Sequence, residues 1–203
     1  MCKEVNVINK AEESLNVTVN DIDGNTQIII ERKENADLFS LSLGEVFKVD
    51  NVEYIVLDQL DGNQTAVIRK ELLKGDMEFG DNNNWKTSSL REYLNGKYLE
   101  EIENAFGKDR IVEHTVNLLS LDGLDDYGTC EDKVSLLTID QYREYRKLLG
   151  GNLNEWWWLV APDSTPSGWS SRYVRCVCSG GGVGYYDCSW RDGGVRPFFI
   201  LQS

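Results

Sequence analysis

The segment that decides our prediction of the fold is Trp157-Trp158-Leu159-Val160-Ala161-Pro162, near the start of the C-terminal fifty residues. A second segment, Gly194-Val195-Arg196-Pro197-Phe198-Phe199, lies close to the C-terminus. Trp157 and Trp158 open an apolar run that is typical of a buried strand. We therefore expect both rings to pack in the core rather than to contact a ligand.

The tail around these two segments has the composition of a binding surface. From Leu159 to Leu201 every charged residue is Arg or Asp, and neither Lys nor Glu occurs. Tyr and Trp supply rigid contact area at low entropic cost, whereas Lys and Glu are depleted from interfaces. The tail therefore predicts a recognition surface. We expect Trp169 and Trp190 to be exposed on it, because their neighbours are polar residues and glycines.

The charge of the chain is uneven along its length. The formal net charge is −13, and residues 1–149 hold thirty acids against seventeen bases, whereas residues 150–203 hold four of each. A protein that binds a phosphate backbone needs a basic footprint, so nucleic acid is not an expected partner. The neutral tail is the part on which contacts can form without long-range repulsion.

The N-terminal residues carry no targeting pattern. Met1 to Lys10 is polar, so we expect no secretory signal, and no apolar stretch is long enough for membrane insertion. We expect synthesis in the cytoplasm, with display on a virion or a surface left open. Five cysteines are an odd number, and without a signal peptide reduced thiols are the default.

Residues 1–37 are predicted to form an N-terminal extension that contains a β-hairpin over Leu15–Arg32, with Asp23-Gly24 as its turn. A calcium loop that begins at Asp21 is disfavoured. Its glycine falls two places early, and Arg32 stands where a bidentate Glu is needed. The extension is a candidate for tethering or for homo-oligomer contacts.

Residues 38–203 are predicted to form one mixed domain. Turn residues and apolar patterns indicate three consecutive strands, over residues 45–49, 52–57 and 65–68.

Two capping-box patterns predict helices in the same domain. Ser89 with Glu92 opens the first helix, which Asn95-Gly96 can end. Beyond it, Leu99, Ile102 and Phe106 keep helical spacing up to Gly107. Thr138 with Gln141 opens the second helix.

The tail motifs carry a resemblance to a known family. The chain is similar to uncharacterised bacterial and phage domains whose tails read roughly W-W-L-R-[ST]-P, then a variable polar stretch with a G-x-V step, then G-V-R-P-A-L. The step stands here as Gly182-Val183. Two upstream parts of the chain also match the pattern, from Asn84-Trp85 to Tyr93-Leu94-Asn95 and from Asp132 to Leu137. The resemblance covers about residues 38–203.

This family looks like a branch of the C-type lectin fold, similar to formylglycine-generating enzymes and to the variable proteins of diversity-generating retroelements. The resemblance implies an α+β fold with small twisted antiparallel sheets and two or more flanking helices. It also implies that residues 151–203 are a variable ligand-binding region. Val160 replaces the usual Arg and Phe198 a small residue, so we expect local packing to be adjusted. The sugar-binding signatures of calcium lectins are missing, which disfavours calcium-dependent glycan binding.

The resemblance implies a binding protein rather than an enzyme, with no cofactor and no metal. The expected ligand is a cell-surface protein or a glycan. The expected contact residues lie in the variable region and are Asp163, Ser164, Trp169, Ser170, Arg172, Tyr173, Arg175, Cys178, Tyr185, Tyr186, Asp187, Ser189, Trp190, Arg191 and Asp192. The expected scaffold positions are Trp157, Trp158, Leu159, Pro162, Val174, Val177, Gly182, Val183, Gly194, Val195, Arg196 and Pro197.

Two alternatives stay open. An enzyme of the formylglycine-generating type would use Cys176, Cys178 or Cys188, and it would need at least one fast-reacting thiol of low pKa. Strand alternation places Cys176 and Cys178 on one face. The single histidine, His114, has no partnering nucleophile motif and is expected to be structural. The other alternative is a structural phage or surface component whose tail is buried in an assembly.

The composition of the tail also suggests how it could be diversified. Retroelement diversification acts mainly on AAC and AAT codons, and randomising their first two bases cannot produce Lys, Glu, Gln, Met or Trp. From Leu159 to Leu201 four of these five residue types are absent, and Trp occurs only at Trp169 and Trp190. This pattern favours diversification, with both tryptophans encoded by the template.

Overall fold

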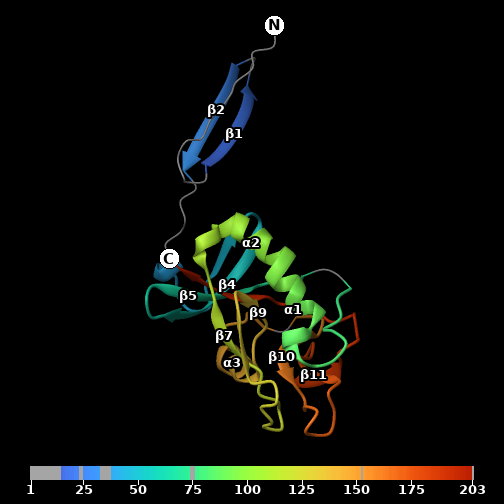
Figure 1. Ribbon diagram of the computed structural model, residues 1–203. Helices are drawn as coiled ribbons and strands as arrows, with labels where there is room; N and C mark the ends of the chain where they lie inside the picture. The colour runs from blue at the N-terminus through green and yellow to red at the C-terminus, as the bar shows by residue number, and fades with distance from the viewer. Residues whose placement is uncertain (1–14, 23–24, 33–37, 74–75, 152, 203) are drawn as a thin grey trace. The chain divides into compact units, whose positions relative to one another are not determined.

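The computed structural model describes residues 15–22, 25–32, 38–73, 76–151 and 153–202. The chain divides into two compact units, Met1–Leu38 and Phe39–Ser203, and each is described by itself. In the first unit, β1 (Leu15–Ile22) and β2 (Asn25–Arg32) form an antiparallel hairpin in which Leu15 lies opposite Arg32 (Figure 1). The hairpin prediction is therefore confirmed. Its predicted Asp23-Gly24 turn lies outside the described residues.

The main sheet of the second unit has the C-terminal strand at its centre. The order is β3-β4-β5-β13-β6, and β9 also pairs with β13, all antiparallel. The strand β13 thus joins the predicted three-stranded meander to segments from the middle of the chain. The strands are β3 (Val46–Val49), β4 (Val52–Leu60), β5 (Gln64–Arg69), β6 (Ile111–Val112), β9 (Val134–Ser135) and β13 (Phe198–Gln202).

Two smaller sheets carry the tail and the loop beside it. The tail sheet has the antiparallel order β10-β11-β12. The strands β7 and β8 form a separate antiparallel ribbon. The bounds are β7 (His114–Asn117), β8 (Thr129–Asp132), β10 (Trp157–Pro162), β11 (Tyr173–Val177) and β12 (Val183–Asp187).

The first helical region differs from its prediction at its start and at Asn95-Gly96, whereas its end at Gly107 follows the predicted helical spacing. The N-cap is Ser88, whose Oγ accepts a hydrogen bond from the Arg91 backbone N–H at 3.0 Å. The helical region does not end at Asn95-Gly96. It continues through a π-helical turn to Phe106 and is terminated by Gly107, where φ is +106°. The elements are α1 (Ser89–Tyr93), the π-helix η3 (Leu94–Tyr98) and α2 (Leu99–Phe106).

The side chain of Asn95 explains why the helix does not end there. Its Nδ2 donates to the carbonyl oxygen of Val134 at 2.8 Å, and its Oδ1 accepts from the backbone N–H groups of Lys133 and Val134. A tertiary contact therefore uses the residue that the local pattern assigned to a helix end.

The capping box of the second predicted helix is confirmed. Thr138 is the N-cap of α3 (Ile139–Tyr145), and both hydrogen bonds between Thr138 and Gln141 are present. Short 3-10 turns complete the described elements at η1 (Leu38–Ser40), η2 (Trp85–Thr87) and η4 (Lys108–Arg110).

The tail sheet is packed on both of its faces at the β10 edge. Trp157 meets Tyr142 of α3 edge-on at 5.7 Å, whereas Trp158 meets Phe79 at 5.9 Å on the other face. Trp157 is 2% exposed and Trp158 is fully buried, so the prediction that both are core residues is confirmed. The two departures from the family pattern, Val160 and Phe198, are buried as well.

The structure confirms an α+β domain with antiparallel sheets and flanking helices. Within the described ranges, no helix is both long and apolar enough to cross a membrane.

Removing residues 1–33 should leave the second unit folded. Each unit has its own internal contacts, so we expect the truncated chain to melt cooperatively at an unchanged temperature. Thermal unfolding followed by circular dichroism checks this expectation. Loss of the cooperative transition would show that the hairpin belongs to the folding core of the domain.

Candidate functional site

The strands β11 and β12 divide the predicted contact residues between two faces. Tyr185 lies opposite Arg175, and Tyr186 lies opposite Val174. Because neighbouring side chains of a strand point to opposite faces, Tyr185 and Tyr186 belong to different surfaces. The single recognition surface expected from the sequence is therefore corrected to two.

The first surface, which we call the Trp169 face, consists of Trp169, Tyr173 and Tyr185. Trp169 stacks on Tyr173 at a centroid distance of 5.3 Å, and Tyr173 meets Tyr185 edge-on at 5.4 Å. Trp169 is 60% exposed and Tyr185 is 51% exposed. The three rings thus form one connected aromatic patch that is open to solvent.

A buried ion pair supports the Trp169 face from below. Arg175 Nη1 donates to Asp163 Oδ1 at 2.6 Å, and both side chains are buried. The guanidinium also lies 5.5 Å from the centroid of the Tyr185 ring and donates to the Val183 carbonyl. Asp163 and Arg175 were expected to contact a ligand, and the structure corrects this, because both side chains are buried and pair with each other beneath the surface.

Ser164 is also buried and is the third expected contact residue that lies inside the domain. Its Oγ donates to Asp122 Oδ2 at 2.6 Å and accepts from the Trp169 backbone N–H at 3.1 Å. Hydrogen bonds from Ser120 and Ser164 lower the pKa of Asp122. A Cβ at Gly168 would lie 2.1 Å from Ser164 Oγ, so only glycine fits there. Ser164 therefore positions Trp169.

The loop that carries Trp169 is held by two other segments. Ser167 donates its backbone N–H to Asp126 at 2.9 Å, which joins this loop to the β7–β8 loop. Both loops lie at the lower end of the domain in Figure 1. Asn83, which is fully buried, donates to the carbonyl oxygens of Ser164 and Tyr173. Sequence reasoning missed Asn83, because it is one of three consecutive asparagines with no local signal.

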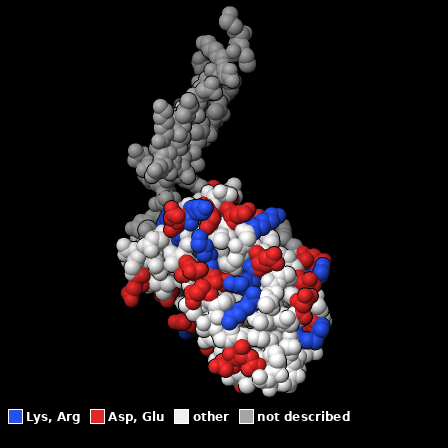
Figure 2. Space-filling view, viewed as in Figure 1, with Lys and Arg blue, Asp and Glu red and all other residues white. Residues whose placement is uncertain are grey.

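The lower end of the domain carries both acidic and apolar side chains. Figure 2 shows an acidic patch within white surface at this end, and Asp122, Asp125 and Asp126 of the β7–β8 loop are exposed. Leu119 and Leu121 of the β7–β8 loop are 43% and 44% exposed. The end of the domain that carries the Trp169 loop thus exposes further apolar side chains.

The second surface, which we call the Trp190 face, consists of Trp156, Tyr186 and Trp190. Tyr186 lies between the other two rings, at 4.3 Å from Trp156 and 4.8 Å from Trp190. Trp190 is 47% exposed, whereas Tyr186 is half-buried. The predicted exposure of Trp169 and Trp190 is confirmed. Tyr186 supports Trp190 rather than standing free.

The side chains of Arg172 and Asp187 bind each other where β11 begins and β12 ends. Arg172 Nε and Nη2 donate to the two carboxylate oxygens of Asp187, each at 2.9 Å. The Arg172 hydrogen bond, with further bonds from Ser189, lowers the pKa of Asp187 to about 2. The planar bidentate pair links the residue before β11 to the last residue of β12.

The other predicted contact residues are at least partly accessible. Arg191 forms an ion pair with Glu78 at 3.1 Å, beside a cavity of 390 Å³. Ser189 and Asp192 are exposed, and Ser170 and Cys178 are half-buried. Of the predicted scaffold positions, all are buried except Gly182, which is exposed, and Val183, which is half-buried.

Two of the three thiols of the tail, Cys176 and Cys188, are shielded from solvent. Cys176 and Cys188 are fully buried, and burial raises their pKa values to about 12 and about 11. A Cβ at Gly184 would contact the sulfurs of Cys178 and Cys176, at 2.8 and 3.6 Å, so both thiols lie on one face as predicted. At Cys176 and Cys188, the raised pKa disfavours the thiolate that the enzyme alternative needs. Among the described residues no group of three His, Cys, Asp or Glu side chains could hold a metal.

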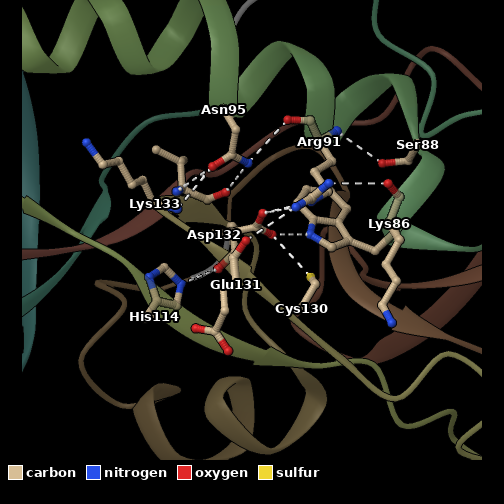
Figure 3. Close-up of polar contacts among 12 residues, drawn as sticks. Lys86, Ser88, Arg91, Asn95, His114, Cys130, Glu131, Asp132 and Lys133 are labelled. Carbon is tan, nitrogen blue, oxygen red and sulfur yellow. Dashed lines mark hydrogen bonds and ion pairs between the residues drawn. The ribbon is translucent and has the colours of Figure 1, made fainter.

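A buried polar network joins the two upstream segments that carry the family resemblance (Figure 3). Asp132 is 2% exposed. It accepts hydrogen bonds from Trp85 Nε1 at 2.7 Å and from Arg91 Nε at 2.7 Å. Both carboxylate oxygens are thereby used, and the cluster ties the two segments together.

His114 lies beside the same network. Its Nε2 shares a hydrogen bond of 3.0 Å with Ser135 Oγ, and its ring packs edge-on against Phe198 at 5.3 Å. Burial lowers the pKa of His114. These contacts fit the structural role expected for it.

Comparisons of this chain with protein-family models, curated proteins and solved structures found no match. The fold and site therefore define an α+β domain with two exposed aromatic faces, and any function rests on the geometry of these faces.

Substitution of a core tryptophan should lower the free energy of unfolding far more than substitution of an exposed ring. Trp158→Ala should lower the free energy of unfolding by about 3–5 kcal/mol through a core cavity, whereas Tyr185→Ala should stay within about 0.5 kcal/mol. Urea denaturation measures both. Comparable losses in the two variants would show that the Trp169 face is part of the core.

The buried ion pair should be needed for the fold of the tail. Arg175→Ala leaves Asp163 as an uncompensated buried charge, so it should cost about 3–5 kcal/mol. Arg172→Ala removes an exposed partner from an ion pair and should change stability far less. If both variants unfolded at the same urea concentration as the wild-type chain, Arg175 would not support the sheet.

Proposed function

We propose that this protein is a ligand-binding module, in which a C-type-lectin-like scaffold presents the Trp169 face to a cell-surface protein or a glycan. The observation that supports this most is the aromatic patch of Trp169, Tyr173 and Tyr185. Two of its rings are more than half exposed, although they sit on a rigid, hydrogen-bonded base. Large exposed rings carry a hydration penalty that a partner relieves.

The construction of the base is the second argument. Asn83 and Ser164 are buried polar groups whose hydrogen bonds hold the backbone on either side of Trp169, and the buried pair of Arg175 with Asp163 lies beneath the rings. A surface that is rigid before binding loses less entropy when it binds. This arrangement suits recognition in which aromatic anchors fill pockets of the partner.

The geometry also bears on diversification. Trp169 and Trp190 are the two exposed tryptophans, and neither can arise from AAC or AAT codons. In the proposal they are constant anchors, and the Tyr, Arg, Ser and Asp residues around them are the variable positions. A nearly identical downstream repeat that differs at adenines, beside a reverse-transcriptase gene, would test this part by sequencing alone.

The binding proposal predicts a loss of affinity without loss of fold. Binding of the purified chain to a printed glycan array and to intact bacterial cells should fall about 30-fold or more in Trp169→Ala, since aromatic hot spots contribute about 2 kcal/mol or more. Leu43→Ala is the matched control, because Leu43 is 52% exposed and lies outside the tail.

Unchanged binding in Trp169→Ala, Tyr185→Ala and Trp190→Ala would contradict the proposal. A fall in affinity for Trp190→Ala alone would move the contact surface to the Trp190 face.

A further inference from the structure

A second feature of the domain does not depend on the recognition proposal. A cavity of 430 Å³ lies between α3 and the tail sheet. Its apolar walls include Trp157, Leu149 and Leu153. The volume falls in the range of small-molecule sites, about 300–1,000 Å³.

The charge of this cavity is opposite to that of the chain. Its lining contains Arg146, Lys147 and Arg196 and, among the described residues, no acidic side chain. The chain as a whole carries a net charge of −13. Three cations around one concave apolar surface would concentrate anions locally.

Arg196 is the cation that needs an explanation. It is 1% exposed, and in the described part of the chain no carboxylate lies within ion-pair distance of it. Its Nε and Nη2 donate to the backbone carbonyls of Arg69 and Leu149 at 2.9 and 3.2 Å. Its guanidinium lies 5.5 Å from the Trp157 ring. These contacts hold its position, but they supply no negative charge.

The electrostatics of Arg196 agree with this geometry. Burial lowers its pKa to about 10, and the charge of Glu71 opposes the shift without forming an ion pair. Burial of a charged group is costly unless an opposite charge compensates it. An anion in the cavity would provide that compensation.

The remaining cations and the rim of the cavity are accessible. Arg146 and Lys147 are exposed at the end of α3, and Arg146 lies 5.8 Å from the Tyr142 ring. Tyr142 donates its hydroxyl to the Gly181 carbonyl at 2.7 Å, which ties α3 to the turn that follows Cys178. Cys178, half-buried, lines the same cavity.

We infer that this cavity binds a small organic anion, with its carboxylate or phosphate group at the three cations and its apolar body against Trp157 and the leucines. Guanidinium groups match planar carboxylates and phosphates with paired hydrogen bonds. The apolar walls distinguish such a ligand from an inorganic ion.

Calorimetric titration of the full chain with four probes tests the inference. Benzoate and phenyl phosphate should bind, whereas benzyl alcohol and inorganic phosphate should bind at least tenfold more weakly. Arg146→Gln/Lys147→Gln should weaken benzoate about tenfold or more. Arg143→Gln/Lys97→Gln is the matched control, because it removes the same charge from exposed helical positions outside the cavity.

Cys178 provides an independent readout at the site itself. Benzoate should slow the alkylation of Cys178 by iodoacetamide, as mapped by mass spectrometry, but should not slow that of Cys130, which is half-buried outside the cavity lining. Trp169→Ala should leave both results unchanged, so this inference and the recognition proposal fail separately.

Four results would overturn the inference. They are equal binding of benzoate and benzyl alcohol, unchanged benzoate binding in the cavity variant, no binding of either organic anion at millimolar concentration, and inorganic phosphate that binds as tightly as phenyl phosphate.

Discussion

The carboxylate of Asp132 is the constraint on which the organisation of the domain depends. It is buried and binds Trp85 and Arg91 through its two oxygens. A continuous series of ring contacts begins at Trp85 and leads to the surface, and its members are Trp85, Phe79, Trp158, Trp156, Tyr186 and Trp190. One buried charge thus fixes an indole, and packing transmits that position to an exposed ring.

The Trp169 face is supported by a different set of contacts. Its rings rest on the ion pair of Arg175 with Asp163, and its loop is tied to the β7–β8 loop through Ser164. Buried polar groups of this kind stabilise a structure only when all of their partners are present. We expect the exposed rings, by contrast, to contribute little to the fold. In our proposal this division lets the surface residues change while the base stays constant.

Local sequence patterns predicted the elements whose cause is local. The meander, the Thr138 capping box, the hairpin and the burial of Trp157 and Trp158 all follow from periodicity, turn chemistry and capping. The patterns failed where a contact with a residue distant in the sequence determines the local structure or the burial of a side chain. Gly96 does not end a helix because Asn95 binds Val134, and Asp163, Ser164 and Arg175 are buried because each meets a partner that no local pattern reveals. Strand alternation alone places Tyr185 and Tyr186 on opposite faces, but the cross-strand neighbours that complete each face depend on the strand register, which the sequence alone did not specify.

The central claim is that Trp169 and Trp190 stand exposed on a base in which the other described tryptophans are packed. Hydroxyl-radical footprinting of the purified chain, resolved by peptide, measures the accessibility of each tryptophan in solution. Trp169 is 60% exposed and Trp190 47% exposed, whereas Trp85 and Trp158 are fully buried. We predict fast oxidation of Trp169 and Trp190 and strong protection of Trp85, Trp157 and Trp158. Equal protection of Trp169 and Trp158 would contradict the account, because the tail would then be buried in the domain or in an assembly.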